Sequence, residues 1–244
     1  MTDFFSRIIM KTRKKRKATV MKNISCPAKK AFNGSKKERA AKIAKRLKDL
    51  YPEAECALAF QNDPFRLIVM ARLSAQCTDK RVNEVSVLLF DAYPDVFSMA
   101  KAPLSHLEAL CRPCGLYRTK ARQISQMCQI LVRDFKGQIP REKETLLALP
   151  GVGEKIANLM LGDCFDDPHI VADTHCIRLS GRLGLVSSKD PKKVTKELEA
   201  IVPKQEQSDF CHRLITLGRE FCRAQNPHCE TCPMRTEESM VLDK

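Results

Sequence analysis

The sequence has no tryptophan, three tyrosines and nine glycines in 244 residues, and it contains no long apolar run. A membrane-spanning helix needs about 18 or more consecutive apolar residues, so none is expected. Glycine- and serine-rich linkers and internal repeats are also missing, which argues against a solenoid or loosely tethered domains. Hydrophobic residues still make up 43% of the chain, enough for a substantial core. The composition therefore predicts a globular protein of one or two domains.

A secretory signal is also missing from the N-terminus. The apolar residues Phe4, Phe5, Ile8 and Ile9 are interrupted by Arg7, precede the basic run and lack a small-residue cleavage site. We therefore expect a cytoplasmic protein, associated with the nucleoid if its host is bacterial. In that reducing compartment the twelve irregularly spaced cysteines would not form a disulfide framework, and most would be small apolar core residues.

Positive charge is concentrated at the start of the chain. The first 50 residues hold 17 Lys and Arg against 3 acidic residues, whereas the remaining 194 hold 26 of each, so the net charge of +14 lies in this segment. Lys and Arg gain affinity for nucleic acid by releasing counterions from phosphates, so we predict a disordered basic extension over residues 1–34 that helps to bind a polyanion. A solubilising leader before a start at Met10 or Met21 is the alternative, and residues 11–17 also resemble a nuclear signal.

Apolar residues recur at helical spacing along nearly the whole chain. A capping box at Ser35 precedes the first predicted helix, and Asp63-Pro64 opens a strongly apolar one. The segment Lys120–Phe135 has a single apolar face. His169–Ala172 is the only strand-like run and is too short to found a sheet. The predicted fold class is all-α.

Two short predicted helices flank the motif Leu149-Pro150-Gly151-Val152-Gly153. Its glycines allow a tight turn, and the next helix begins with unpaired N–H groups that suit an anionic oxygen. A plain helix-connecting turn is the alternative for such a motif alone. The context favours DNA phosphate, because Lys155 follows two residues later and Val171-Ala172-Asp173-Thr174-His175 lies downstream.

This combination resembles the endonuclease III-like DNA glycosylases of the helix-hairpin-helix superfamily, which carry a glycine-proline-aspartate signature. The resemblance extends in family order over roughly residues 37–232. The matching stretches are Leu73–Asp79, Gly115–Ala121, Leu149–Lys155, Val171–His175 and the cysteine cluster that begins at Cys222. It implies two helical domains. Residues 56–167 would form a six-helix domain bearing the hairpin, and residues 35–55 would join 168–244 in the second.

The resemblance also implies roles for individual residues. Lys155 would attack the anomeric carbon of a damaged nucleotide, displace the base and form a Schiff base whose β-elimination cuts the strand. Asp173 would take a proton from Lys155 or stabilise positive charge on the sugar, although it also has the sequence context of a helix N-cap. Gln76 would insert into the duplex, unless it is a buried helix-terminal glutamine. Lys120 would lie near the DNA backbone, together with the hairpin.

The implied function is a monomeric base-excision-repair glycosylase with abasic-site lyase activity on oxidised pyrimidines in double-stranded DNA. A mismatch-specific thymine or uracil glycosylase stays open, because motifs do not show which residues select the base. Adenine glycosylases of this fold generally lack the lysine and carry an acidic residue that is missing here between Phe65 and Thr78. A non-catalytic DNA-binding or damage-sensing relative is the alternative from another class, and the presence of Lys155 and Asp173 argues against it.

Three cysteines crowd the C-terminus as Cys222, Cys229 and Cys232. Their spacing matches the first three ligands of the family's [4Fe-4S] cluster, but Glu238 stands at the fourth position and no cysteine follows. The cluster would need a carboxylate, solvent or another cysteine to complete it, or it is lost. Zinc held with His228 is a further alternative, which the adjacency of His228 and Cys229 makes awkward.

Overall fold

In a computed structural model of the chain, residues 34–235 are described and form eleven α-helices and three short 3-10 helices. No β-strand occurs in this part of the chain, and the run His169–Ala172 is irregular, so the all-α prediction is confirmed. Residues 1–33 of the predicted basic extension, and Glu238, lie outside the described residues. Within 34–235 no helix is both long and apolar enough to cross a membrane.

The helices follow one another through the chain with short connections. Their bounds are α2 (Lys36–Leu50), α3 (Pro64–Leu73), α4 (Asp79–Ala92), α5 (Val96–Ala100), α6 (Leu104–Cys111), η2 (Arg112–Cys114), α7 (Tyr117–Phe135), α8 (Lys143–Ala148), α9 (Glu154–Cys164), α10 (Thr174–Arg182), α11 (Pro191–Glu199), η3 (Lys204–Glu206), α12 (Gln207–Glu220) and η4 (Pro233–Arg235).

Several helix starts lie where the sequence predicts them. The Ser35 hydroxyl accepts a hydrogen bond from the backbone N–H of Glu38 at 3.2 Å, and the Glu38 carboxylate accepts one from the Ser35 N–H at 2.7 Å. The carboxylate of Asp63 likewise caps α3. Helix α7 begins at Tyr117 instead of Lys120, because the left-handed residue Leu116 turns the chain into the helix earlier.

Residues 56–167 hold seven α-helices, and the five-residue helix α5 is the shortest of them, whereas the resemblance implies a six-helix domain. Pro94 ends the preceding segment as expected, but Asp95 and Ser98 then form a reciprocal capping box that starts a new turn of helix.

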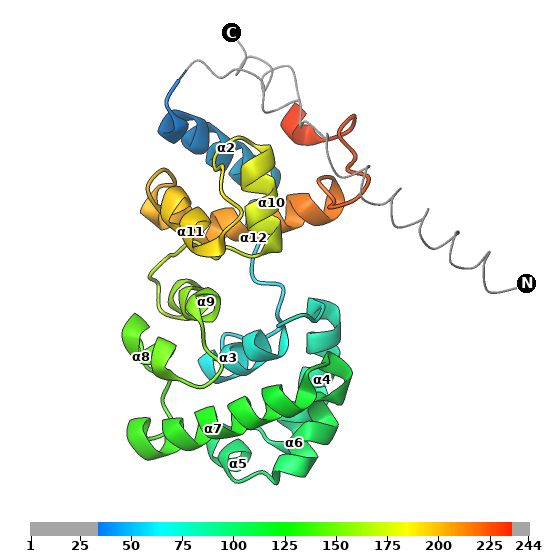
Figure 1. The fold of residues 1–244 in the computed structure, drawn as a ribbon, viewed down its shortest axis with the longest axis vertical. Helices are drawn as coiled ribbons and strands as arrows, with labels where there is room; N and C mark the ends of the chain where they lie inside the picture. Colours follow the sequence, from blue (N-terminus) through cyan, green and yellow to red (C-terminus); the bar gives the residue numbers. More distant parts are fainter. Residues whose placement is uncertain (1–33, 236–244) are drawn as a thin grey trace, which may run out of the picture.

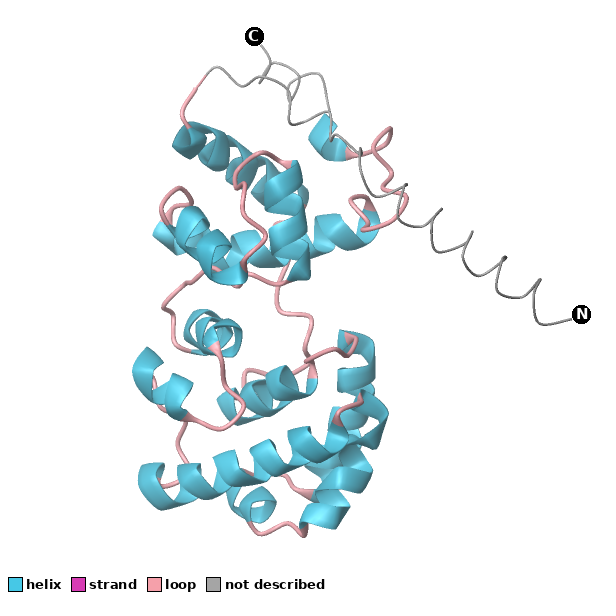
Figure 2. Cartoon of the chain, in the orientation of Figure 1, coloured by secondary structure: helices cyan, strands magenta, loops and turns pink. Residues whose placement is uncertain are grey.

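The helices pack into two groups, which Figures 1 and 2 show one above the other. Helices α3 to α9 form the first group, in which α7 packs against α5 and α6 and α9 packs against α3. Helices α2, α10, α11 and α12 form the second, in which α12 contacts both α2 and α10. The chain passes between the groups twice, through residues 51–63 and 165–173, so the second group is built from both ends of the described chain.

Polar contacts fasten α2 to the second half of the chain. The buried Arg39 side chain donates from Nε to the carbonyl oxygen of Leu183 at 2.8 Å. At the other end of α2 the Tyr51 hydroxyl donates to the Glu220 carboxylate at 2.9 Å. These bonds span more than 140 residues of sequence, so they form only when the ends of the chain come together.

Close packing joins the two groups where α9 meets α12. A Cβ added to Gly162 would lie 2.0 Å from the Ser208 hydroxyl, which itself accepts a hydrogen bond from the His169 N–H at 3.2 Å. One residue further along α9, the Asp163 carboxylate pairs with the His212 ring on α12 at 2.9 Å. Glycine at 162 therefore sets how closely the two helices approach.

We expect Gly162→Ala to lower the free energy of unfolding by about 1–3 kcal/mol, because the added methyl overpacks this contact. Gly181→Ala on α10 is the matched control, since a Cβ there meets nothing within 4 Å. It should leave stability unchanged or raise it by up to about 1 kcal/mol through helix propensity. Urea denaturation of both variants measures this, and equal midpoints would contradict the assignment.

Candidate active site

The predicted hairpin joins α8 to α9, and Gly151 determines its shape. Gly151 has φ +82°, and a Cβ there would lie 2.7 Å from Cδ and Nε of Arg72. The left-handed backbone and this close approach leave room for glycine alone. The side chains of Leu149 and Val152 are buried and anchor the turn in the core.

Gly153 is the N-cap of α9 and faces open space. No side chain caps this helix, and a Cβ on Gly153 would meet no atom within 4 Å. The first N–H groups of a helix have no partner within it and carry partial positive charge, so this end is suited to an anionic oxygen. Because the side chains of Leu149 and Val152 are buried, these two residues reach such a ligand only through their backbone.

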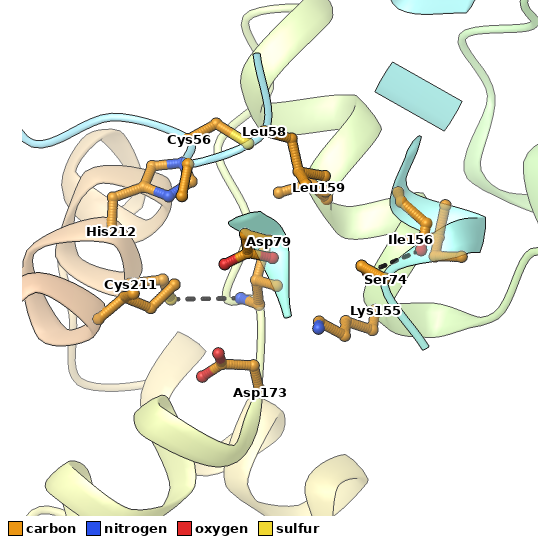
Figure 3. Close-up of a pocket in the computed structure, with 14 residues that line it drawn as sticks. Cys56, Leu58, Ser74, Asp79, Lys155, Ile156, Leu159, Asp173, Cys211 and His212 are labelled. Atoms are coloured by element: carbon orange, nitrogen blue, oxygen red, sulfur yellow. Dashed lines mark hydrogen bonds between the residues drawn. The ribbon is translucent and has the colours of Figure 1, made fainter. Parts of the chain in front are cut away.

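A cleft lies between the two groups of helices, and both Lys155 and Asp173 line it (Figure 3). Lys155 is exposed in the first turn of α9, and Asp173 is the N-cap of α10. The two side chains border the same open space in Figure 3. The structure thus brings together a primary amine and a carboxylate from different parts of the fold.

The rest of the cleft is mostly apolar. Its remaining lining residues are Cys56, Ala57, Leu58, Ala71, Ser74, Asp79, Ile156, Leu159, Val171, Cys211, His212 and Ile215. Asp79 forms an ion pair with Arg219, which connects α4 to α12 at this cleft. An apolar slot with polar groups at its margin is suited to a flat, partly polar ring.

Asp173 also holds the start of α10. Its Oδ1 atom accepts a hydrogen bond from the Cys176 N–H at 2.6 Å, so the N-cap predicted from the sequence is present. Two residues along, burial lowers the pKa of His175, which keeps its ring neutral at neutral pH. The Asp173 carboxylate therefore has no imidazolium as its neighbour on this helix.

Cys56 is one of two cysteines in the cleft lining, the other being the buried Cys211. Burial, reinforced by the charge of the nearby Asp163, raises the pKa of the Cys56 thiol to about 12. The thiolate is the reactive form of cysteine, so Cys56 stays inert at neutral pH. Lys155 is left as the amine nucleophile in the lining.

Seven described residues other than glycine have left-handed backbone, and two of them, Gln76 and Leu116, stand on exposed turns beside α3 and α7. Gln76 has φ +54° and follows α3, two residues after Ser74 of the cleft lining. Leu116 has φ +47° and is 56% exposed immediately before α7. Leucine rarely occupies this conformation, and such strain is typical of functional positions. Sequence reasoning missed Leu116, although its place after Gly115 at the start of a helix was a usable signal.

Lys120, which the resemblance places near the DNA backbone, does not present its amine at the surface. Its side chain is fully buried, and Nζ donates to the carbonyl oxygens of Leu73 at 2.7 Å and Cys114 at 2.8 Å. Burial lowers the pKa of this amine. The helical pattern placed Lys120 correctly on α7, but only the packed structure shows that it points inward.

The three C-terminal cysteines do not form a recognisable metal site. Within residues 34–235 no three Cys, His, Asp or Glu side chains are grouped to hold a metal ion. Instead, the Cys222 thiol accepts a hydrogen bond from Arg182 Nη1 at 3.3 Å, and its carbonyl oxygen accepts one from Arg178 Nη2 at 3.2 Å. The described residues therefore do not fit a complete cluster or zinc site.

The chain is similar to a family of DNA repair proteins in sequence and in structure. The family model described as "HhH-GPD superfamily base excision DNA repair protein" matches residues 69–204. Endonuclease III of Bacillus subtilis is 43% identical over 187 residues, which cover 76% of this chain and 85% of that protein. Endonuclease III of Synechocystis is 41% identical over 201 residues, covering 82% and 91%. A solved structure of a trapped endonuclease III–DNA covalent intermediate is 40% identical, with a TM-score of 0.77 over 81% of this chain and 92% of that one.

The cap at Asp173 gives a direct test of its structural role. We expect Asp173→Ala to lose about 1 kcal/mol of stability, because the Cys176 N–H then has no capping partner. The stability of Asp173→Asn should stay close to that of the parent protein, since asparagine caps helices as well as aspartate does. Thermal or urea denaturation distinguishes the two, and an Asn variant as unstable as the Ala variant would show that the charge matters to folding.

Proposed function

This chain belongs to the endonuclease III family, within the helix-hairpin-helix superfamily of base excision DNA repair proteins, and we propose that Lys155 and Asp173 carry out its chemistry. As a member, it is a base-excision DNA glycosylase with abasic-site lyase activity whose partner is damaged double-stranded DNA. The observation that supports the catalytic pair is that the two side chains line one cleft from different helices.

In the proposed reaction the Lys155 amine attacks C1′ of an extruded nucleotide while the bond from C1′ to the base breaks. Asp173 accepts the proton that the amine loses, and the base leaves with the bonding electrons and takes up a proton. Ring opening gives a protonated Schiff base, and loss of a C2′ proton then expels the 3′ phosphate. The similar solved structure is a trapped covalent intermediate, which supports a covalent bond between enzyme and DNA here.

Binding would rely on the hairpin and on the two exposed turns. The uncapped N-terminus of α9 at Gly153 would hold a DNA phosphate through backbone N–H groups. Moving a nucleotide out of the stack costs a few kcal/mol, and Gln76 and Leu116 are placed to fill the gap that it leaves. The Gln76 turn adjoins the cleft through Ser74.

We infer that the substrates are oxidised pyrimidines. The cleft lining is largely apolar, which suits a damaged ring that has left the duplex, and it includes the ring of His212, which pairs with the buried Asp163. We further propose that the two packed groups of helices correspond to two domains, 56–167 and 35–55 with 168–244. The bacterial relatives favour action in the cytoplasm, on nucleoid DNA if the host is bacterial.

Borohydride should trap the enzyme on a duplex that contains an abasic site, and Lys155→Ala should abolish the adduct. Lys192→Ala, which removes an exposed lysine of α11, is the control and should leave it intact. Asp173→Asn should slow single-turnover base release by about 100-fold or more. Borohydride trapping on thymine glycol, dihydrouracil, G:T and A:8-oxoguanine duplexes tests the substrate class. An adduct that survives Lys155→Ala would refute the proposed nucleophile.

A second proposal concerns the cofactor. A [4Fe-4S] cluster is held by four cysteine thiolates, and this chain has three in the matching positions. We propose that it does not retain a complete cluster. When a cluster is bound in this family it would supply a rigid tie for the C-terminal loop, whereas here Arg178 and Arg182 hold the backbone of that loop to α10.

Protein purified without oxygen should therefore contain well below four irons and four sulfides per chain. Glu238→Cys, which restores the fourth thiol, is the matched variant and should raise both values and add visible absorbance. A content of four irons and four sulfides per chain in the unaltered protein would overturn the proposal.

A further inference from the structure

Lys120 is a buried cation without an acidic partner in the described residues. Its Nζ atom lies among the carbonyl oxygens of Leu73 and Cys114, close to the thiols of Cys77 and Cys114. Removing an ammonium from water is costly, and an apolar side chain would fill the same space without that cost. The presence of a buried ammonium at this position is therefore explained by the two carbonyl groups that it binds.

The two carbonyl groups belong to the last residues of two different helices. Leu73 is the last residue of α3, and Cys114 is the last residue of η2. The final carbonyl groups of a helix have no partner within it and carry partial negative charge, so one cation satisfies both. The ammonium thus joins two helix ends that are 41 residues apart in sequence.

Each of these helix ends leads directly into one of the exposed turns. Gln76 lies three residues after Leu73, and Leu116 lies two residues after Cys114. Both turns have left-handed backbone, at φ +54° and φ +47°. Few rotatable bonds separate the ammonium from each exposed side chain, so the Lys120 bonds, together with the side-chain hydrogen bond between Cys77 and Cys114, link the position of one turn to that of the other.

We propose that Lys120 is a positioning residue, whose buried ammonium fixes the separation of the Gln76 and Leu116 turns so that both side chains enter the duplex together at a lesion. This inference rests on the proposed function. Lys120 itself touches neither DNA nor the reacting atoms, and acts through the two turns.

The test uses full-length Lys120→Met, which keeps the length of the side chain but cannot donate a hydrogen bond. Gln207→Met is the matched control. Gln207 is also buried, and its amide donates to two backbone carbonyl oxygens, those of Glu199 at 3.3 Å and Val202 at 3.2 Å; it is not one of the residues that line the cleft. Both variants are assayed at a temperature where denaturation curves show them folded.

Two readouts separate positioning from general stability. One is the ratio of affinities for a duplex with a tetrahydrofuran abasic analogue and for the same duplex undamaged. The other is the fluorescence of 2-aminopurine placed opposite the analogue, which rises when the base is unstacked. Lys120→Met should reduce the affinity ratio at least tenfold and suppress the fluorescence rise, with affinity for undamaged DNA changed less than twofold. Gln207→Met should retain both signals.

A double-variant comparison tests whether Lys120 acts through the turns. In a Gln76→Ala, Leu116→Ala background, adding Lys120→Met should reduce the affinity ratio less than twofold further, because the side chains that it positions are already gone. If Lys120→Met does not fold, Lys120→Gln takes its place with the same expected directions.

The proposal is overturned if folded Lys120→Met keeps the parental ratio and fluorescence. It is also overturned if Lys120→Met and Gln207→Met lose both signals in proportion to their loss of stability. Failure of the proposed function is distinguishable, because the unaltered protein would then form no borohydride adduct and show no preference for the abasic duplex.

Discussion

The closeness of α9 to α12 is the constraint on which the cleft depends. Helix α9 carries Lys155 at one end and Gly162 near the other, while α12 contributes His212 to the cleft lining. Because Gly162 has no side chain, the Ser208 hydroxyl can occupy the space beside it. A wider contact would rotate or shift α9 and move the amine relative to Asp173, although neither residue is part of the contact. Catalytic geometry is therefore governed by packing well away from the reacting groups.

Much of the fold and of the candidate site could be predicted from the sequence, because the signals that specify these parts are local. Capping residues such as Ser35 and Asp63 act on the N–H groups next to them, so their effect is visible in a few letters. The hairpin glycines and the cap at Asp173 are local in the same sense. Family resemblance then supplied what local rules do not, the pairing of Asp173 with Lys155 across a cleft.

The failures have a common physical cause, which is that burial is a property of tertiary packing. A lysine on α7 looks the same in sequence whether it faces solvent or a pair of carbonyl oxygens, so Lys120 was misjudged. The same applies to the pairing of His212 in the cleft lining with Asp163, since these two positions are 49 residues apart and form no motif.

The two passages of the chain between the helix groups bear on how the molecule is made. Helix α2 precedes the other described helices, yet Arg39 and Tyr51 at its two ends bond to Leu183 and Glu220 in the second half of the described chain. A ribosome-bound chain that has emerged only as far as α9 lacks both of these partners, so the two bonds cannot yet form. Cys211, His212 and Ile215 of α12 line the cleft, so its lining is complete only after this helix has been synthesised.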